Sequence, residues 1–380
     1  MVQLGEKMTY ETLRLTENPF RLTPPLDQKE IFWAGMHEVK DNIEKRIKIA
    51  MRTQPSRIVL NWGSYGSGKT HASLYFSKTN RLEEISADLG ASPAKSIKIT
   101  LPRSSNNIVQ EFLRSFLGQY SLEEIYADFK RLEEEFNTEK LIEMIDAFSN
   151  DNSIADAFKK FIKLDLENSD EFNKFKNYIY GDNTKSTLTY LGLPLGLTND
   201  EQIANFLATI INCITYEKKL YSTFLIWLDE FEDIDTVKKS LADRFTTFLR
   251  QFIDKTPNNL ILFLNFTQKA FMDIEDLSIY LGEALTSRAK AKIDFQNPTI
   301  EEAIEYVQEL CKHYQKGSST NPFDTDATIK YALEHIGNLT ARKINETFSI
   351  IFEMALLEGK EQITQEFIDN IKDEIIAWEE

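Results

Sequence analysis

The sequence predicts an α/β protein, in which helices cover both faces of a parallel sheet and an all-α domain follows. Three apolar runs carry the first part of this prediction, at residues 58–60, 224–228 and 260–266, and only the last contains a polar residue, Asn265. Such runs are typical of parallel strands that are buried on both faces. From residue 299 onward the chain holds only helical patterns. We therefore expect a sheet-containing core at 57–298 and an all-α domain at 299–380.

At 380 residues, of which 42% are hydrophobic, the chain is long enough for both parts. It holds no run of about 18 apolar residues and no apolar signal sequence, so we expect no membrane span. Cys213 and Cys311 lie in apolar helical patterns, which indicates core cysteines of a reducing compartment and a cytoplasmic protein. A net charge of −16 argues against a protein that coats nucleic acid through its overall field.

The first 56 residues form an N-terminal segment ahead of the sheet. Residues 1–30 are polar and irregular and include Pro19 and Phe20. Residues 31–52 have the apolar spacing of a helix. The first strand of the sheet is expected at 57–62, where β-branched and apolar residues follow one another.

A glycine-rich loop follows the first strand directly and matches the pattern G-x-x-x-x-G-K-[ST]. Its residues are Gly63, Ser64, Tyr65, Gly66, Ser67, Gly68, Lys69 and Thr70. Glycines allow backbone angles that turn successive N–H groups inward, and the helix that follows points its positive end at the same place. The loop is therefore predicted to bind a nucleoside triphosphate. Lys69 would reach the β- and γ-phosphates, and Thr70 would ligate Mg²⁺.

Two short elements and an acidic stretch come next. Alternation at 96–101 predicts a strand, and 108–116 has helical spacing. Residues 118–200 are acidic, rich in helical patterns and interrupted by polar turns, and 123–148 has the spacing of one amphipathic helix. This insertion is interpreted either as a solvated surface module with one buried stripe or as a partner-docking element.

The buried run at 224–228 follows a helical pattern at 201–218 and ends at Asp229 and Glu230. Sheets of this kind bind their ligands at the carboxyl ends of the strands. Asp229 is expected to hold Mg²⁺, directly or through water. Glu230 is expected to polarise the attacking water as a general base.

The run at 260–266 brings two more polar side chains to the same edge, Asn265 and Thr267. A polar group at that point can lie between the two phosphate-site motifs and orient the attacking water. Either residue can do this, and the sequence does not choose between them. An ordinary turn-forming Asn or a hydrogen-bonded Thr is the alternative for each.

Two arginines complete the candidate site. Arg288 follows a helical pattern just before a short last strand, where it would project toward the γ-phosphate of a neighbouring subunit. Arg342 lies early in a helix of the all-α domain. A cation on this domain can reach the triphosphate and report its hydrolysis as a domain rotation. A solvated surface arginine is the alternative for both.

Taken together, these motifs resemble the AAA+ ATPases, in which a P-loop core precedes a helical lid. The closer resemblance is to the branch that holds origin-recognition initiators, ExeA-like ATPases and TnsC-like transposition regulators. Two stretches carry it, ENPFRLTPP at 17–25 and the segment 337–371 that contains GNLTARKINETF. The resemblance implies that residues 1–56 close on the nucleotide, with Pro19 and Phe20 near the adenine, and that 299–380 form the lid.

The resemblance also implies the function, an ATPase that binds and hydrolyses MgATP to drive self-assembly or partner remodelling. A homo-oligomer with a protein partner is expected, with a DNA-transaction or genome-defence system as the setting. One alternative is a nucleotide switch that does not hydrolyse ATP. The other is an ATP-dependent regulator that binds DNA. Its candidate cations are Lys238, Lys239, Arg244, Arg250, Lys290 and Lys292.

Overall fold

The computed structural model describes residues 10–23, 31–101, 107–165, 169–181, 184–194, 196–197, 199–268, 277–317 and 321–375. The chain divides into two compact units that interleave along the sequence. The larger unit holds Ile43–Asn61 and Asn80–Ile293, and the smaller unit holds Met1–Asn42, Trp62–Thr79 and Asp294–Glu380. Residues near the N-terminus pack into the core of the C-terminal helices.

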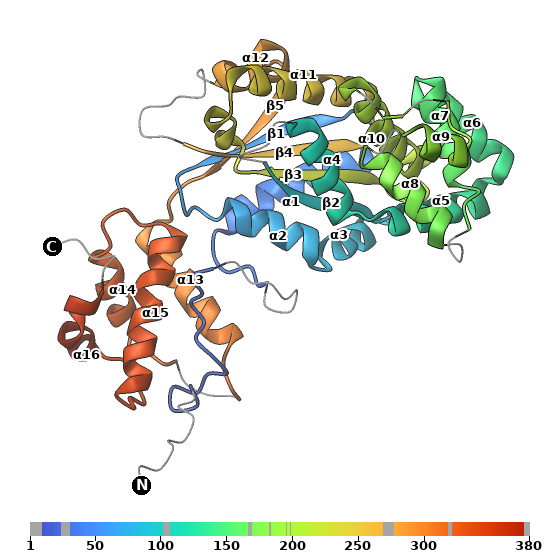
Figure 1. Ribbon diagram of the computed structural model, residues 1–380. Coiled ribbons are helices and arrows are strands. Elements are labelled where there is room, and N and C mark those ends of the chain that lie inside the picture. Colours follow the sequence, from blue (N-terminus) through green and yellow to red (C-terminus); the bar gives the residue numbers. More distant parts are fainter. Residues whose placement is uncertain are drawn as a thin grey trace, which may run out of the picture. The chain divides into compact units, whose positions relative to one another are not determined.

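The larger unit is built on a five-stranded sheet with the order β2-β3-β4-β1-β5 (Figure 1). The strands are β1 (Arg57–Gly63), β2 (Ala94–Thr100), β3 (Thr223–Asp229), β4 (Leu260–Thr267) and β5 (Ala289–Phe295). Strand β3 pairs in parallel with both of its neighbours, β2 and β4. All seven residues of β3 are buried, as its uninterrupted apolar run predicts.

Helices lie on both sides of this sheet, α11 (Lys239–Lys255) and α12 (Leu277–Thr286) on one and α3 (Arg81–Leu89) on the other (Figure 1). The predicted α/β fold class, a parallel sheet with helices on both faces and an all-α part at the C-terminal end, is confirmed. The predicted helix at 31–52 is shorter in the structure, where α1 is His37–Arg52. Gly35 and Met36 have positive φ angles, which end any helix before His37.

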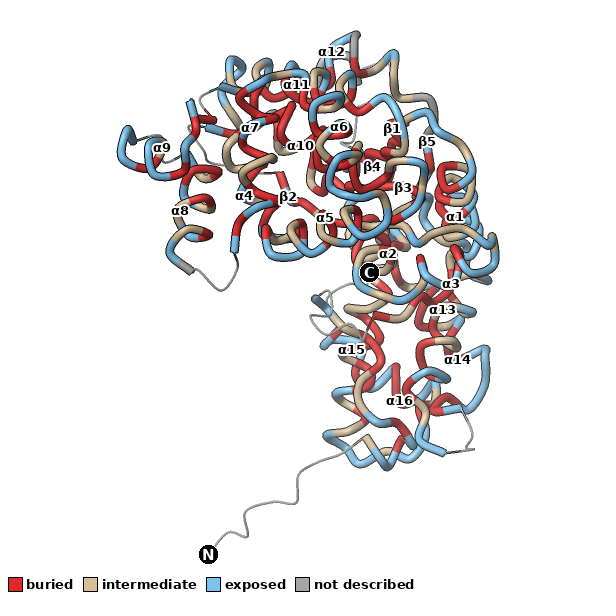
Figure 2. The backbone as a smooth tube through the Cα atoms, turned by 90° about the vertical axis from the view of Figure 1, so that its right-hand side faces the viewer, coloured by how far each residue is buried: buried red, intermediate tan, exposed pale blue. Residues whose placement is uncertain are grey.

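Helix α10 (Asp200–Ile214) is buried nearly all round, since only Asp200, Glu201 and Asn212 lie outside its buried set (Figure 2). The acidic stretch forms five helices, α5 (Leu122–Phe136), α6 (Thr138–Ser149), α7 (Asn152–Phe161), α8 (Ser169–Ile179) and α9 (Lys185–Leu191). The first three of them pack against α10. The ring of Phe158 stacks on that of Phe206 in α10, with centroids 4.9 Å apart. The insertion therefore shares a core with the helix that precedes β3.

The single helix predicted at 123–148 is wrong, because the chain breaks at Asn137 into α5 and α6. Asn137 has φ of +73°, and its side chain accepts a hydrogen bond from the Lys140 backbone to begin α6. The apolar spacing continues across the break, so periodicity alone could not reveal it. Helix α5 begins with a capping box between Ser121 and Glu124.

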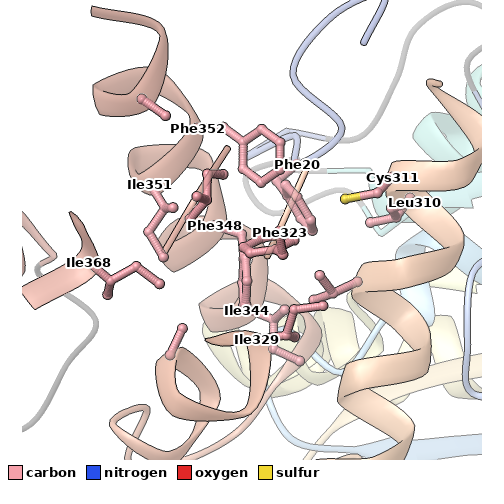
Figure 3. Close-up of a cluster of buried hydrophobic side chains, with 14 of the residues drawn as sticks. Phe20, Leu310, Cys311, Phe323, Ile329, Ile344, Phe348, Ile351, Phe352 and Ile368 are labelled. Carbon is pink, nitrogen blue, oxygen red and sulfur yellow. The ribbon is translucent and has the colours of Figure 1, made fainter. Parts of the chain in front are cut away.

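The smaller unit is helical. It holds α2 (Lys69–Lys78), α13 (Ile300–His313), α14 (Asp326–Glu334), α15 (Ala341–Leu357) and α16 (Gln365–Asn370). In its apolar core the ring of Phe20 packs against Phe348 and Phe352, with centroids 5.2 and 5.3 Å apart (Figure 3). The Asn18 amide donates to the Ser349 hydroxyl at 3.1 Å. The N-terminal segment is thus part of the helical core.

Two further observations concern expectations from composition. Among the described residues, none of the helices combines the length and apolarity that crossing a membrane requires. Cys213 and Cys311 are free and buried, and burial raises the pKa of each thiol well above its usual value. Both cysteines therefore act as apolar core residues.

Candidate functional site

The glycine-rich loop joins β1 to α2, and its glycines occupy positions that other residues would strain. Gly66 and Gly68 have φ angles of +80° and +94°, in the left-handed region that favours glycine. A Cβ on Gly63 would lie 2.5 Å from the Phe295 carbonyl oxygen, which is closer than real Cβ atoms approach. The loop conformation therefore depends on these three glycines.

The Lys69 side chain turns into its own loop. Its ammonium group donates to the carbonyl oxygens of Gly63 and Ser64, both at 2.9 Å, and to the Ser67 hydroxyl at 3.2 Å. The residue is only 7% exposed. Thr70 follows as the second residue of α2 and is half-buried. The loop thus holds one buried cation among backbone groups, beside the N-terminus of a helix.

The apex of the loop contacts the start of α15. The Arg342 backbone N–H donates to the Gly66 carbonyl oxygen at 3.2 Å. A Cβ on Gly66 would lie 2.7 Å from the Arg342 Cβ and 3.3 Å from the Thr340 hydroxyl. The Arg342 guanidinium lies over the Tyr65 ring, 4.9 Å from its centroid, and its Nε donates to Glu346 at 2.9 Å. The predicted Arg342 is therefore next to the predicted phosphate loop.

A second group of residues, which includes the predicted Asp229 and Asn265, lies in the larger unit. We call it the polar row, because one side chain comes from each of four neighbouring strands: Lys98 (β2), Asp229 (β3), Asn265 (β4) and Asn61 (β1). Lys98 Nζ is 3.0 Å from Asp229 Oδ2, and Asn265 Nδ2 donates to Asp229 Oδ1 at 2.9 Å. Asn61 Nδ2 donates to Asn265 Oδ1 at 2.7 Å.

The polar row surrounds a buried carboxylate with a charged partner and a hydrogen-bonding partner. Asp229 is 3% exposed, and burying a charge is costly unless the charge is paired. Here each carboxylate oxygen has a partner, an ammonium on one side and an amide on the other. The strand register explains why Asp229 and Asn265 are neighbours, because they directly follow Leu228 and Leu264, which pair with each other.

Glu230 stands directly after β3 in a strained conformation. Its φ is +56° and its ψ is +41°, in the left-handed region where non-glycine residues are uncommon. Such strain costs on the order of 1–3 kcal/mol and often occurs at functional sites. Glu230 is half-buried and begins the short 3₁₀ helix at Phe231–Thr236. The bend redirects the chain immediately after Asp229.

The structure separates the two residues between which the sequence did not choose. Asn265 is 1% exposed and contacts Asp229. Thr267 is half-buried, and its backbone N–H donates to the Glu232 carboxylate at 3.1 Å. Asn265 is therefore the one that lies in the polar row.

Three other candidates have structural contacts. Arg288 forms an ion pair with Asp254 at 2.8 Å on the larger unit, with its side chain 38% exposed. Arg244, one of the candidate DNA-binding cations, donates twice to Asp200, at 2.5 and 2.6 Å. Phe20 is 2% exposed, because its ring packs inside the helical core. Any contact of the Pro19–Phe20 segment with an adenine is therefore left to its backbone.

Sequence reasoning missed Asn61 and Lys98. The available signal for Asn61 was a polar residue inside an apolar strand, two positions before the first loop glycine. Lys98 alternates with Ile97 and Ile99, which are buried, so the pattern placed it on the other face of β2. Neither signal showed that these side chains meet Asn265 and Asp229.

Similarity to two solved structures, each with a TM-score of 0.53, supports the fold. No protein-family model matches the sequence, and no curated protein matches it either. The ORC2 protein of Aeropyrum pernix, in ADPNP–ADP complexes, is similar over 94% of this chain and 72% of its own, at 13% identity and a TM-score of 0.53. Its ADP form gives 96% and 72% coverage, 11% identity and a TM-score of 0.53. A Walker-type ATPase of Pyrococcus abyssi covers 90% of this chain and 73% of its own, at 14% identity and a TM-score of 0.47.

Proposed function

We propose that this protein is an ATPase that binds ATP with Mg²⁺ and hydrolyses it to ADP and phosphate. Its AAA+ fold is also that of the ORC2 protein of Aeropyrum pernix. The observation that carries the proposal is the loop at 63–70, whose three glycines occupy positions that a larger residue would strain and whose lysine turns inward. A loop of this form at a helix N-terminus is suited to phosphate groups.

Each loop residue has a role in this proposal. The inward backbone N–H groups of the loop and the first turn of α2 hold the phosphates. Lys69 leaves its carbonyl partners and donates to the β- and γ-phosphates instead. The positive charge of Lys69 offsets part of the negative charge of the triphosphate. This local charge is needed because the net charge of the protein is −16.

Thr70 and Asp229 would hold Mg²⁺ through a hydroxyl and a carboxylate, the kind of oxygen ligands that Mg²⁺ prefers. When bound, the ion neutralises charge on the phosphate oxygens. Glu230 acts as the general base that takes the proton from the attacking water, and Asn265 orients that water. Glu230 is half-buried and has a strained backbone, and such strain often occurs at functional sites.

Two arginines are also part of the proposal. Arg342 contacts the loop apex and would respond to the γ-phosphate. Arg288 is partly exposed and would act on a neighbouring subunit, so a homo-oligomer is part of the proposal. Self-assembly or remodelling of a protein partner, in a DNA-transaction or genome-defence setting, is the use of ATP that we propose.

The test measures nucleotide binding and phosphate release with matched variants. Lys69→Ala is expected to lower MgATP affinity at least tenfold, about 1.4 kcal/mol. Lys78→Ala, an exposed lysine at the other end of α2, is its control and is expected to change nothing. Glu230→Gln is expected to bind ATP but lose turnover by about 10²–10⁴-fold. Glu232→Gln, the same change two residues later, controls for altered charge.

Two results would contradict this proposal. Unchanged MgATP affinity in folded Lys69→Ala would show that the loop does not bind the nucleotide. Wild-type turnover in Glu230→Gln would remove the general base. ATP binding without any turnover in the wild-type protein would instead identify the non-hydrolysing nucleotide switch.

A further inference from the structure

The direction of the hydrogen bonds in the polar row is determined by chemistry. An ionised carboxylate only accepts hydrogen bonds, so Asn265 must present its NH₂ group to Asp229. The carbonyl oxygen of Asn265 then faces Asn61, which must donate its own NH₂ group. The orientation of both amides follows from Asp229, and the last group of the row is the Asn61 carbonyl oxygen.

That oxygen has no hydrogen-bond partner among the residues that the structure describes. Asn61 is 0% exposed, so the oxygen is buried as well as unpaired. A buried acceptor without a donor costs free energy, and each such group in a native protein needs an explanation. Turning the amide over would not help, since it would place two carbonyl oxygens face to face.

The missing partner must be a hydrogen-bond donor. Asn61 lies two residues before Gly63 on β1 and two hydrogen bonds from Asp229. The Lys69 ammonium donates to three oxygen atoms of its own loop. Water bound to Mg²⁺ is a strong donor, and Mg²⁺ in proteins usually keeps several waters.

We propose that Asn61 is a positioning residue of the nucleotide site, whose carbonyl oxygen accepts a hydrogen bond from a water molecule of the Mg²⁺ shell. This inference rests on the proposed function. It adds a role for β1 itself, since Asn61 links the strand that carries the phosphate loop to the strand that carries Asp229. Groups around a metal's direct ligands commonly change its affinity by about 10–100-fold when mutated.

The experiment measures the Mg²⁺ concentration that gives half of the full increase in affinity for a fluorescent ADP. Asn61→Leu keeps the approximate volume and removes both polar groups. Asn205→Leu is the matched control, because Asn205 is 2% exposed and its Oδ1 is also buried without a partner, but it lies on α10. We expect about a tenfold rise in the half-saturating Mg²⁺ for Asn61→Leu, and no change for Asn205→Leu. Nucleotide affinity without Mg²⁺ should be the same in both variants.

A second comparison separates a direct role from one that acts only through Asn265. In an Asn265→Leu background, the Asn61→Leu change should still raise the half-saturating Mg²⁺ concentration. If its effect disappears there, or if Asn61→Leu behaves as Asn205→Leu does, the proposal is overturned. Binding is measured per folded molecule, and Asn61→Ala replaces Asn61→Leu if the latter does not fold. Failure of the proposed function would look different, since the wild-type protein would then show no Mg²⁺-dependent nucleotide binding.

Discussion

The guanidinium of Arg342 is held by Tyr65 at the apex of the glycine-rich loop, stacked over its ring and hydrogen-bonded to its hydroxyl. Tyr65 is 67% exposed, so the stacking is a surface contact, which is worth about 0.5–1 kcal/mol. A γ-phosphate would offer Arg342 a stronger partner. Tyr65 therefore keeps Arg342 close to the loop with a contact that a nucleotide can replace.

Replacing Tyr65 should change the preference between ATP and ADP. Tyr65→Ala removes a partner that competes for Arg342, so we expect affinity for a non-hydrolysable ATP analogue to rise about two- to fivefold relative to ADP. Tyr65→Phe keeps the stacking and should change this ratio less. Paired binding titrations measure it. An unchanged or lower ratio in Tyr65→Ala would show that Tyr65 does not compete for Arg342.

Gly66 should be more sensitive to substitution than its backbone angle alone explains. Gly90 has a φ of +60°, and no atom lies within 4 Å of the position that a Cβ would take there, so Gly90→Ala tests the angle alone, about 1–2 kcal/mol. Gly66→Ala adds the close approach to Arg342, and we expect a larger loss of unfolding free energy together with weaker nucleotide binding. Denaturant unfolding and a binding titration measure the two effects. Equal losses for both variants would show that the Arg342 contact adds nothing.

Lys98 should stabilise the protein through Asp229. Lys98→Met leaves the buried carboxylate in contact with the neutral Asn265 amide but without its ammonium partner, and breaking a buried ion pair in this way costs about 3 kcal/mol. Lys95→Met on the same strand is the control, because its partner Glu124 is 52% exposed and such surface pairs contribute about 1 kcal/mol or less. Denaturant unfolding of both variants gives the comparison. Similar losses would argue that Asp229 does not depend on Lys98.

The acidic insertion should be required for folding of the larger unit. Phe158→Ala removes a fully buried ring that stacks on α10, and we expect it to cost about 3–5 kcal/mol. Tyr190→Ala in the same insertion is the control, since Tyr190 is 46% exposed. Deletion of residues 121–198 should expose the apolar surface of α10 and yield little soluble protein. A soluble deletion variant that binds ATP would show that the insertion is a separable module.

Arg288 should affect turnover independently of its ion pair. Asp254→Ala breaks the same ion pair as Arg288→Ala but leaves the arginine in place. If Arg288 acts on a neighbouring subunit, only Arg288→Ala loses turnover, by up to about 10³-fold, and wild-type activity per molecule rises with protein concentration. Phosphate release over a dilution series measures both. Equal turnover in the two variants, with activity that does not depend on protein concentration, would show that Arg288 has only a structural role at the surface.

The sequence alone determined the local features of this protein. The apolar runs at 224–228 and 260–266, the second broken only by Asn265, became β3 and β4 because strands buried on both faces need apolar residues at nearly every position. The loop at 63–70 was recognisable because its glycines meet a local backbone requirement. Asp229 and Asn265 were placed at one edge because parallel strands end together.

Only the tertiary structure decided which distant residues meet. Asn61 and Asn265 are 204 residues apart in the chain, and Tyr65 and Arg342 are 277 apart. The order β2-β3-β4-β1-β5 brings the first pair onto neighbouring strands, and no local pattern contains that order. The stacking of Phe158 on Phe206 likewise depends on helix packing. Periodicity shows that a side chain is buried, but the side chains that surround it are set by how the elements pack.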